Sequence, residues 1–536
     1  MASKNKKAWL LVLTLFLMIF SLSACFGGEA NVDAPYILVP DEDYEPRFGV
    51  SISEFALNVN RNYSINPFTT SNISNILVTQ LMYDTLFELD PSFNLTTNLV
   101  TSWESRSPTA WLFYIDTSIR FWDGSTLSAY DVAYSIQWAM RSPLFSQRLD
   151  LILGVGALDE RLLMINLRRA NTAFPALLNI PIIRYGSIDS EAPMGTGPFM
   201  INEAHTQLSI FPDHRLASEL PIETIHLREF RGAESIMTAF ENTDINLVTN
   251  DPTGVFRLGF SPANEIRYFA TTNMHYLAFN TRGTFFSNPQ FRHAMNFIVD
   301  RNLIVTQCLG GAGTPTTLPL HPSSPLFNDS LAQLFEYSPS RAKEALEAAG
   351  VVVLDGYNDG YRVMMIHNIP VPVELNFIVN NDNPFKVAAA RAIVRSMEDL
   401  GIRVNLRELT WNDFLAALSA RNFDMFYAET MLTADFSLRE LLLFDGSLNF
   451  GAIQDPVLEE HLLTYKHTDE ENRQRNLNVL LQYIGDTAPI VPILFEMHQV
   501  ITHRGVASGL RPTQANIFYN FHEWNIRLTE PDQIGR

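Results

Sequence analysis

The first 24 residues constrain this chain most, because they decide where the rest of it folds. Lysines at positions 4, 6 and 7 precede an uncharged apolar stretch over residues 8–20, and the small residue Ala24 closes the segment. This order is typical of a secretory signal segment, and roughly 13 apolar residues are fewer than the ~20 of a permanent membrane helix. The sequence therefore predicts that residues 1–24 are a signal peptide and that the remainder folds outside the cytoplasm.

The end of this segment, Leu22-Ser23-Ala24-Cys25, resembles the bacterial lipobox. In that motif the cysteine thiol is lipidated and becomes the first residue after cleavage. Two acyl chains anchor a protein stably, whereas a single chain such as one palmitate holds it only marginally. We expect a lipoprotein held by Cys25 on the extracytoplasmic face of the cell membrane. The alternatives are an ordinary signal peptide with an incidental cysteine, or an uncleaved anchor.

Composition narrows the class of protein and its partners. At 536 residues the chain is long enough for two or three domains, and 46% apolar with 18% charged residues is a globular composition. Removing residues 1–24, which carry three lysines and no acid, takes the net charge from −20 to −23. Such an acidic protein repels nucleic acid, which we exclude as a partner. The second of the two cysteines, Cys308, is left without a disulfide partner or a thiolate metal site.

Turn residues and hydrophobic periodicity divide the first half of the chain. Residues 25–46 mix Gly, Pro and acids and predict a flexible tether. Helical spacing predicts a helix over residues 72–86, and alternation predicts a strand over 111–121. After the Asp123-Gly124 turn, Ser128 and Asp131 have the spacing of a capping box at a helix start. Residues 193–201 hold two glycines without the Lys-Ser/Thr of a phosphate loop, and we interpret them as a sharp crossing between structural units.

The second half predicts alternating strands and helices. We expect a strand over residues 266–280, a helix over 289–305 and an edge or crossover strand over 489–501. Between them lies a β-α-β unit, whose strands and helix are expected at the following positions. They are a strand at 371–379, a helix at 385–400 ended by Gly401 and a strand at 402–409. A further helix at 412–420 and a short strand at 423–427 are expected after this unit.

Motifs of catalysis are not found in the sequence. It contains no Gly-x-Ser-x-Gly, His-Glu-x-x-His, Cys-x-x-Cys or Walker pattern. We therefore expect no enzyme, no catalytic residue, no cofactor and no metal ligand set. A glycosidase needs only two carboxylates brought together in space, so a surface-anchored hydrolase stays open as an alternative.

An ordered set of segments resembles the family 5 extracellular solute-binding proteins, the oligopeptide-, dipeptide- and nickel-binding components of ABC transporters. Phe121-Trp122-Asp123-Gly124 through Asp131-Val132 is similar to the family pattern F-x-D-G-x-P-L-T-A-x-D-V, with Thr126 where proline is usual. Three later segments follow the family order. They are Gly195-Thr196-Gly197-Pro198-Phe199, the run from Phe279-Asn280 through Phe286, Arg292, Ala294-Met295 and Asp300-Arg301, and Pro489-Ile490-Val491-Pro492. The resemblance spans about residues 48–524.

The resemblance implies an α/β, two-lobed periplasmic-binding-protein-like fold that closes on its ligand about a hinge. The first lobe would run from 47 to 273 with an extra subdomain at about 72–185, and the second from 274 to 488. Residues 489–536 would return to the first lobe, with 266–276 and 489–500 as hinge strands.

The resemblance also implies where a ligand binds. Peptide-binding members hold the ligand's ammonium with an aspartate in a stretch like G-W-x-x-D-Y-x-x-P, which corresponds here to residues 423–436 without its Trp and Pro. Thr433 stands in the direct register, and Asp435, preferred over Glu429, is the expected carboxylate. Further candidates by position are Tyr427, Thr430, Ser71, Asn72, Tyr268, Asn273 and Tyr276. No histidine stands in this acidic stretch, which argues against a nickel-type ligand.

The function expected from all this is a lipid-anchored, monomeric substrate-binding protein of an ABC importer. It would capture a peptide or similar small zwitterionic solute and deliver it to the permease subunits in the membrane. Besides the hydrolase, a sensory or chaperone-like binding protein without a transporter is an alternative.

Overall fold

The computed structural model describes residues 50–254 and 264–529. The predicted signal peptide, Cys25 and the tether at 25–46 lie outside these ranges. Across the described ranges, no helix combines the length and the apolar character that crossing a membrane requires.

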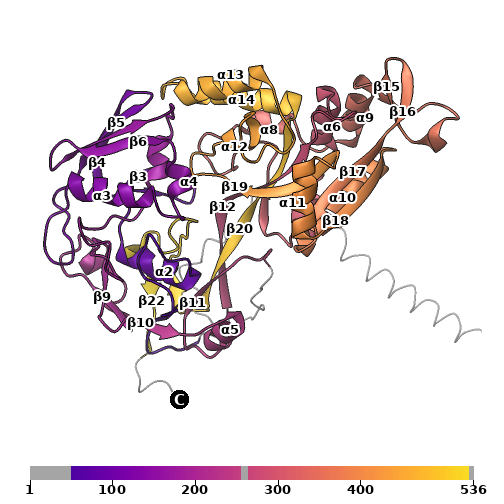
Figure 1. Cartoon of the computed structure of the whole chain (residues 1–536). Helices are drawn as coiled ribbons and strands as arrows, with labels where there is room; N and C mark the ends of the chain where they lie inside the picture. The colour runs from indigo at the N-terminus through magenta and orange to yellow at the C-terminus, as the bar shows by residue number, and fades with distance from the viewer. Residues whose placement is uncertain (1–49, 255–263, 530–536) are drawn as a thin grey trace, which may run out of the picture. The chain divides into compact units, whose positions relative to one another are not determined.

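A mixed sheet of seven strands is the largest sheet. Its strand order is β11-β20-β12-β19-β17-β18, and β13 also pairs with β20. Strands β12 and β20 are antiparallel and lie side by side over most of their length (Figure 1). The strands span β11 Leu247–Asn250, β12 Asn264–Phe279, β13 Gly313–Pro315, β17 Glu374–Asn380, β18 Arg403–Leu409, β19 Met425–Met431 and β20 Ile490–His503.

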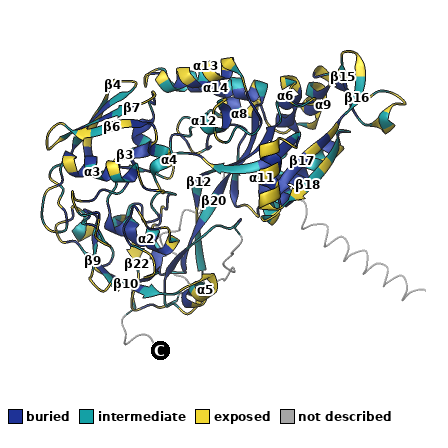
Figure 2. Cartoon of the chain, viewed as in Figure 1, coloured by how far each residue is buried: buried dark blue, intermediate teal, exposed yellow. Residues whose placement is uncertain are grey.

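Strand β20 lies inside this sheet, so the alternative of an edge strand over residues 489–501 is wrong. It is buried along most of its length, as the dark blue in Figure 2 shows. The sheet tolerates Pro492, which has no N–H to donate, because the register shifts between His275 and Tyr276 on the partner strand. The Pro492 carbonyl accepts a hydrogen bond from Arg301 Nε at 2.9 Å.

Two four-stranded sheets are built mainly from the first half of the chain. Their orders are β1-β10-β9-β8 and β4-β5-β7-β6. Their strands span β1 Ala56–Val59, β4 Val100–Ser107, β5 Ala110–Ile115, β6 Ile152–Ala157, β7 Leu162–Leu167, β8 Phe199–Ile201, β9 Gln207–Ile210 and β10 Thr224–Glu229. The small sheets consist of β2 Phe87–Leu89, β3 Leu95–Thr97, β14 Val351–Val352, β15 Val363–Ile366, β16 Ile369–Pro372, β21 Ala507–Ser508 and β22 Asn525–Ile526.

The helices follow the predicted periodicity, mostly with shorter ends. They span α2 Ile73–Met82, α3 Ala129–Ala139, α4 Ser146–Leu149, α5 Ala233–Glu241, α6 Pro289–Ile298, α7 Arg301–Leu303, α8 Asp329–Gln333, α9 Pro339–Ala348, α10 Pro384–Glu398, α11 Trp411–Ala420, α12 Arg439–Leu442, α13 Pro456–His467 and α14 Arg473–Thr487. The predicted helix over 289–305 is interrupted after Ile298. Val299 is extended, and the Asp300 side chain accepts from Leu303 N at 2.9 Å, which starts a new helix.

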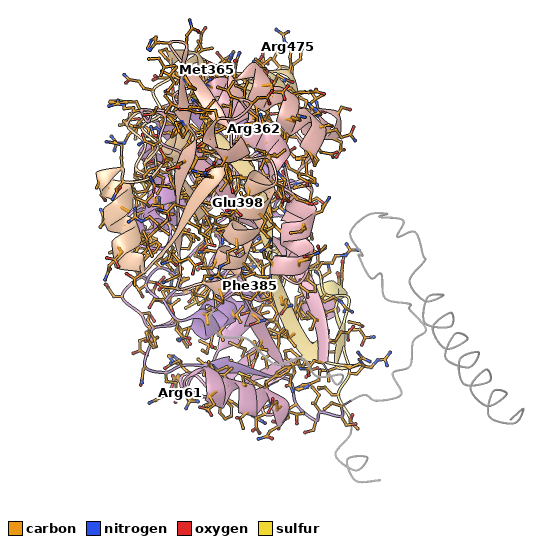
Figure 3. The ribbon with its side chains drawn as sticks, turned by 90° about the vertical axis from the view of Figure 1, so that its right-hand side faces the viewer. Arg61, Arg362, Met365, Phe385, Glu398 and Arg475 are labelled. Carbon is orange, nitrogen blue, oxygen red and sulfur yellow. The ribbon has the colours of Figure 1, made fainter. Side chains whose placement is uncertain are left out.

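The predicted β-α-β unit is confirmed. Strands β17 and β18 are parallel neighbours, and helix α10, whose first and last turns carry Phe385 and Glu398 in Figure 3, connects them. Gly401 has a φ of 79°, which favours glycine just beyond the helix end. The predicted strand over 371–379 is divided into β16 and β17.

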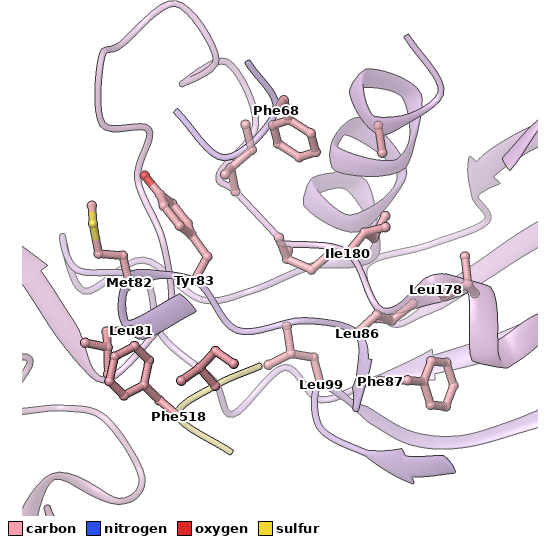
Figure 4. Packing of buried hydrophobic residues seen from close by; sticks show 14 of the residues in the cluster. Phe68, Leu81, Met82, Tyr83, Leu86, Phe87, Leu99, Leu178, Ile180 and Phe518 are labelled. Carbon is pink, nitrogen blue, oxygen red and sulfur yellow. The ribbon is translucent and has the colours of Figure 1, made fainter. Parts of the chain in front are cut away.

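Three large hydrophobic cores hold these elements together. The first core draws its buried side chains from residues 52–269 and again from 500–524. The second and third cores use residues 277–494 and 274–495. Figure 4 shows part of the first core, where Phe518 joins Leu81 and Met82. The boundaries of the two lobes themselves stay a prediction.

Two of the sequence motifs pack directly against each other. Trp122 Nε1 donates to the Gly197 carbonyl at 3.1 Å, and Trp122 N to the Gly195 carbonyl at 3.2 Å. A Cβ on Gly195 would lie 2.7 Å from the Met82 carbonyl oxygen. The crossing predicted at residues 193–201 is therefore a close backbone contact, which only glycine fits.

Candidate functional site

Asp435, the preferred acid, lies in the loop after β19 and is buried. Its Oδ2 accepts from Lys466 Nζ at 2.7 Å and from Asn171 Nδ2 at 2.9 Å, and its Oδ1 accepts from Thr433 Oγ1 at 2.5 Å. Lys466 is in the last turn of α13, and Asn171 follows β7. Ala434, next to Asp435, packs against the first core. This group of side chains, called the Asp435 contact below, joins segments about 264 residues apart in sequence.

The Asp435 contact is built to hold a negative charge beside an ammonium. Burial alone raises the pKa of Asp435, but the Lys466 ammonium and the Thr433 and Asn171 hydrogen bonds lower it more, so the net pKa is below its usual value. The carboxylate is therefore ionised at neutral pH. The chain itself supplies the ammonium that the family resemblance would assign to a ligand.

Glu429, the second candidate acid, belongs to a different cluster around His275. Glu429 on β19 is directly opposite His275 on β12, and Glu496 comes from β20. His275 Nε2 lies 2.7 Å from Glu496 Oε1 and 3.1 Å from Glu429 Oε2. Lys386, on α10, forms an ion pair with Glu429 Oε1. We call these four residues the His275 cluster.

The charges of the His275 cluster balance one another. Burial lowers the pKa of His275, but the two neighbouring carboxylates outweigh it and raise the pKa above its usual value. The imidazole and Lys386 in turn lower the pKa of Glu429, against the effect of its burial. Two carboxylates thus face two cations, so Glu429, like Asp435, already has a cationic partner from the chain.

The other predicted site residues divide into three groups. Tyr427 Oη lies 2.7 Å from His275 Nδ1, and Asn273 Nδ2 donates to Glu496 Oε2 at 2.5 Å, so both belong with the His275 cluster. Thr430 is opposite Met274, Tyr276 is buried against Phe426, and Tyr268 is 46% exposed. Ser71 is exposed, while Asn72 caps α2 by accepting from Ser74 N and Asn75 N. A role for any of them in ligand binding stays a prediction.

Several partners of these residues were missed from the sequence, namely Asn171, Lys466, His275, Lys386 and Glu496. Their contacts with the predicted acids join distant segments, which sequence spacing does not reveal. One local signal was present, because Glu496 and His498 follow the apolar run 490–495 at a two-residue spacing. Two polar residues on one face of a buried strand need partners there.

An aromatic group also connects the first-core region to the third core. Phe93, in the turn between β2 and β3, has a φ of 62° and lies 5.0 Å from the His321 ring and 5.2 Å from the Phe436 ring, measured between centroids. His321 and Phe436 both contact Phe495. Phe93 therefore lies among aromatic residues of the other region.

A protein-family model matches the middle of the chain. The family described as bacterial extracellular solute-binding proteins, family 5 (middle), matches residues 94–442. The matched range includes most of the segments on which the sequence resemblance rests, together with Asn171, Glu429 and Asp435.

Individual proteins and solved structures agree with this match. The chain is 24% identical to heme-binding protein A of Haemophilus influenzae over 49% of each chain. It is 21% identical to the periplasmic oligopeptide-binding protein OppA of Escherichia coli over 83% of this chain and 88% of the relative. The structure of the periplasmic murein tripeptide-binding protein MppA, in its unliganded open form, superposes with a TM-score of 0.73 at 18% identity, covering 90% of this chain and 99% of that chain. This structural likeness shows the fold, which is the α/β fold of periplasmic binding proteins.

Proposed function

The chain belongs to the family 5 bacterial extracellular solute-binding proteins, and from this premise we propose that it captures a peptide or a similar small zwitterionic solute and delivers it to the permease of an ABC importer. Two similar proteins, OppA and MppA, are named for binding oligopeptides and a murein tripeptide. Their names support peptides as the ligand class, and heme-binding protein A shows that other solutes occur among the relatives.

The observation that carries the ligand class is the Asp435 contact. Its carboxylate is buried and ionised, and it is paired with a primary ammonium. We propose that the ammonium of the solute exchanges with Lys466 at this carboxylate. Such an exchange keeps the buried charge paired at every stage, whereas an unpaired carboxylate there would cost several kcal/mol. Asn171, which also donates to Asp435, would then bring the segment after β7 to the same solute.

The cellular setting is part of the same proposal. We propose that Cys25 carries the lipid that holds the protein on the extracytoplasmic face of the cell membrane, and that the protein acts as a monomer without chemistry on its solute. The lobes would meet about the paired strands β12 and β20, which run between the first core and the other two. Closure would then bend these strands while their hydrogen bonds persist.

The test uses the full chain, purified in detergent. Native mass spectrometry identifies any solute that copurifies, and thermal unfolding is then followed with a tripeptide and with the same tripeptide N-acetylated. A ligand at 100 times its Kd stabilises the folded state by about 2.7 kcal/mol. We expect stabilisation by the free peptide and much less by the acetylated one. Turnover of the peptide would contradict a binding function.

Two variants identify the carboxylate that binds the ammonium. We expect Asp435→Asn to weaken binding of the free peptide at least 10-fold. Glu429→Gln is the matched control, because it also removes a lysine-paired carboxylate, and we expect it to change peptide affinity less than 3-fold. Unchanged affinity in both variants would remove the ammonium site from the proposal.

A further inference from the structure

A second group of potential ligand atoms lies on the same sheet, on the other side of Glu496 from His275. It consists of Asp251, which directly follows β11, and of Glu496 and His498 on β20. Their side-chain ligand atoms all lie within 4.8 Å of one another. We call these three residues the Asp251 group. The Asp435 contact uses none of them.

The sheet itself places the three side chains on one face. Glu496 and His498 are two residues apart on a strand, and side chains at this spacing point to the same side. Strand β11 pairs with β20 so that Asn250 is opposite Gln499, which puts the next residue, Asp251, beside His498. The arrangement therefore depends on one strand ladder and needs no closing motion.

The distances are those of atoms that share an ion. His498 Nε2 lies 3.7 Å from Glu496 Oε2 and 3.9 Å from Asp251 Oδ1, which is too long for hydrogen bonds. Ligands that are each about 2.1 Å from a zinc ion are about 3 to 4 Å apart. Imidazole nitrogen and carboxylate oxygen are moreover both ligands that zinc binds.

His498 Nε2 has only the two carboxylates, at ion-pair distance, as its partners. The atom is buried, and within the described ranges it makes no hydrogen bond. A buried polar atom that makes no close hydrogen bond calls for an explanation. A metal ion bound to Nε2 would satisfy it.

Hydrogen bonds from neighbouring residues orient both carboxylates. Thr253 donates to Asp251 Oδ1 from its backbone N at 2.9 Å and from Oγ1 at 2.8 Å, and Thr253 Oγ1 also lies 2.9 Å from Glu496 Oε1. His275 Nε2 holds Glu496 Oε1. Asn273 Nδ2 donates to Glu496 Oε2 at 2.5 Å. Such outer partners are typical of metal sites.

We propose that Asp251, Glu496 and His498 bind one divalent transition-metal ion of the zinc type, as a resident ion where β11 and β20 meet. The His498 side chain is 27% exposed and that of Asp251 is 41% exposed, so an ion can reach the site from solvent. This inference departs from the absence of a metal ligand set expected from the sequence. It does not depend on which solute the protein carries.

The test measures zinc binding by the full chain, made without a histidine tag and purified in detergent. After the protein is stripped with EDTA, Zn²⁺ is titrated against a chromophoric chelator, and the bound metal is counted by mass spectrometry. We expect one ion per chain, and at least 100-fold weaker binding in His498→Ala and in Asp251→Asn. His467→Ala and Asp486→Asn are the matched controls on α13 and α14, and we expect both to bind zinc like the wild type.

A spectroscopic measurement keeps the test decisive if a variant misfolds. The X-ray absorption spectrum of the zinc-loaded wild-type protein should show only nitrogen and oxygen ligands at about 2.0–2.2 Å, with the scattering pattern of one imidazole. A sulfur ligand at about 2.3 Å would place the ion on a cysteine and overturn the site. Absence of stoichiometric binding, or wild-type zinc affinity in both folded variants, would overturn it as well. Because no solute is present, failure of peptide binding would leave these outcomes unaffected.

Discussion

At the residue scale, the ion pair between Lys466 and Asp435 has a structural role and, in our proposal, a second role in binding. It neutralises a buried carboxylate while the proposed solute is absent, and it marks where a solute ammonium would be accepted. The Lys466 side chain is 18% exposed and that of Asp435 only 2%, so solvent screens this pair weakly. The stability of the protein should therefore depend on it.

Lys466→Met removes the cation and leaves the buried carboxylate unpaired. Breaking a buried pair in this way typically costs 3–5 kcal/mol, and we expect a loss of that size in the free energy of unfolding at pH 7, measured in urea. The double variant Lys466→Met/Asp435→Asn should recover most of the loss, because the uncompensated charge is gone. A loss below about 1 kcal/mol in the single variant would show that the pair is not buried in solution.

His321 predicts a pH dependence of stability. Burial beside Phe93 and Phe495 lowers the pKa of His321 to about 4, from an ordinary value of 6.5. The unfolded chain binds the proton first as the pH falls below about 6.5, so the unfolding free energy decreases until the pH reaches about 4. At pH 5 this one group should remove about 2 kcal/mol relative to pH 8.

His321→Asn tests this dependence. In the wild type, Ser323 N donates to His321 Nδ1 at 3.0 Å. Asparagine keeps a side-chain acceptor for Ser323 N, but asparagine does not titrate. We expect the wild type to lose about 2 kcal/mol more than the variant between pH 8 and pH 5, measured by urea unfolding at each pH. Parallel pH profiles for the two proteins would contradict the buried neutral histidine.

The sequence indicated two candidate acids but did not reveal their surroundings. Asp435 is a buried carboxylate paired with an ammonium, but the ammonium expected there was that of a ligand, and this role stays a prediction. Its cation, however, comes from Lys466 on α13, and Asn171 comes from a segment far back in the chain. Spacing along a sequence reports neighbours on one element, so ion pairs between distant elements remain invisible to it.

Elements with a strong period and clear end signals were predicted well. The unit β17-α10-β18 has alternating strands, an Ala-rich helix and Gly401 at its end, and it agrees with the structure to within a few residues. The sequence did not reveal that α6 ends at Ile298, because the apolar pattern continues while the Asp300 cap stops the helix. For strand β20, two prolines suggested an edge strand, which was wrong. The strand lies inside the sheet, where a register shift accommodates Pro492.

The contact between the two glycine-containing motifs gives a prediction at the scale of elements. Gly195→Ala would place a Cβ 2.7 Å from a backbone oxygen of α2 and 2.8 Å from the Trp122 ring. We expect a loss of 1–3 kcal/mol in the free energy of unfolding. Gly154→Ala in β6 is the matched control, because no atom lies within 4 Å of its added Cβ, and it should change stability by less than 1 kcal/mol. Equal effects of the two substitutions would contradict this packing.

At the scale of the whole molecule, we expect a destabilising substitution in one core to reduce amide protection mainly around that core. Trp524 belongs to the first core and Phe377 to the second, and both are buried. Truncation of either to alanine should cost about 3–5 kcal/mol. Hydrogen exchange followed by mass spectrometry should show Trp524→Ala exposing amides mainly in residues 52–227, and Phe377→Ala exposing them mainly in 277–494. Loss of protection across both ranges in each variant would indicate a single cooperative unit.

The composition of the first core also affects when it can form. With a secretory segment at its N-terminus, as the sequence predicts, the chain crosses the membrane beginning with the residues of this core. Val506, Leu510, Phe518 and Trp524, which complete the core, cross last. The second and third cores lie within residues 274–495, so they can form while the final segment is still in transit. The part of the protein that leaves the translocation channel first is therefore the part that finishes folding last.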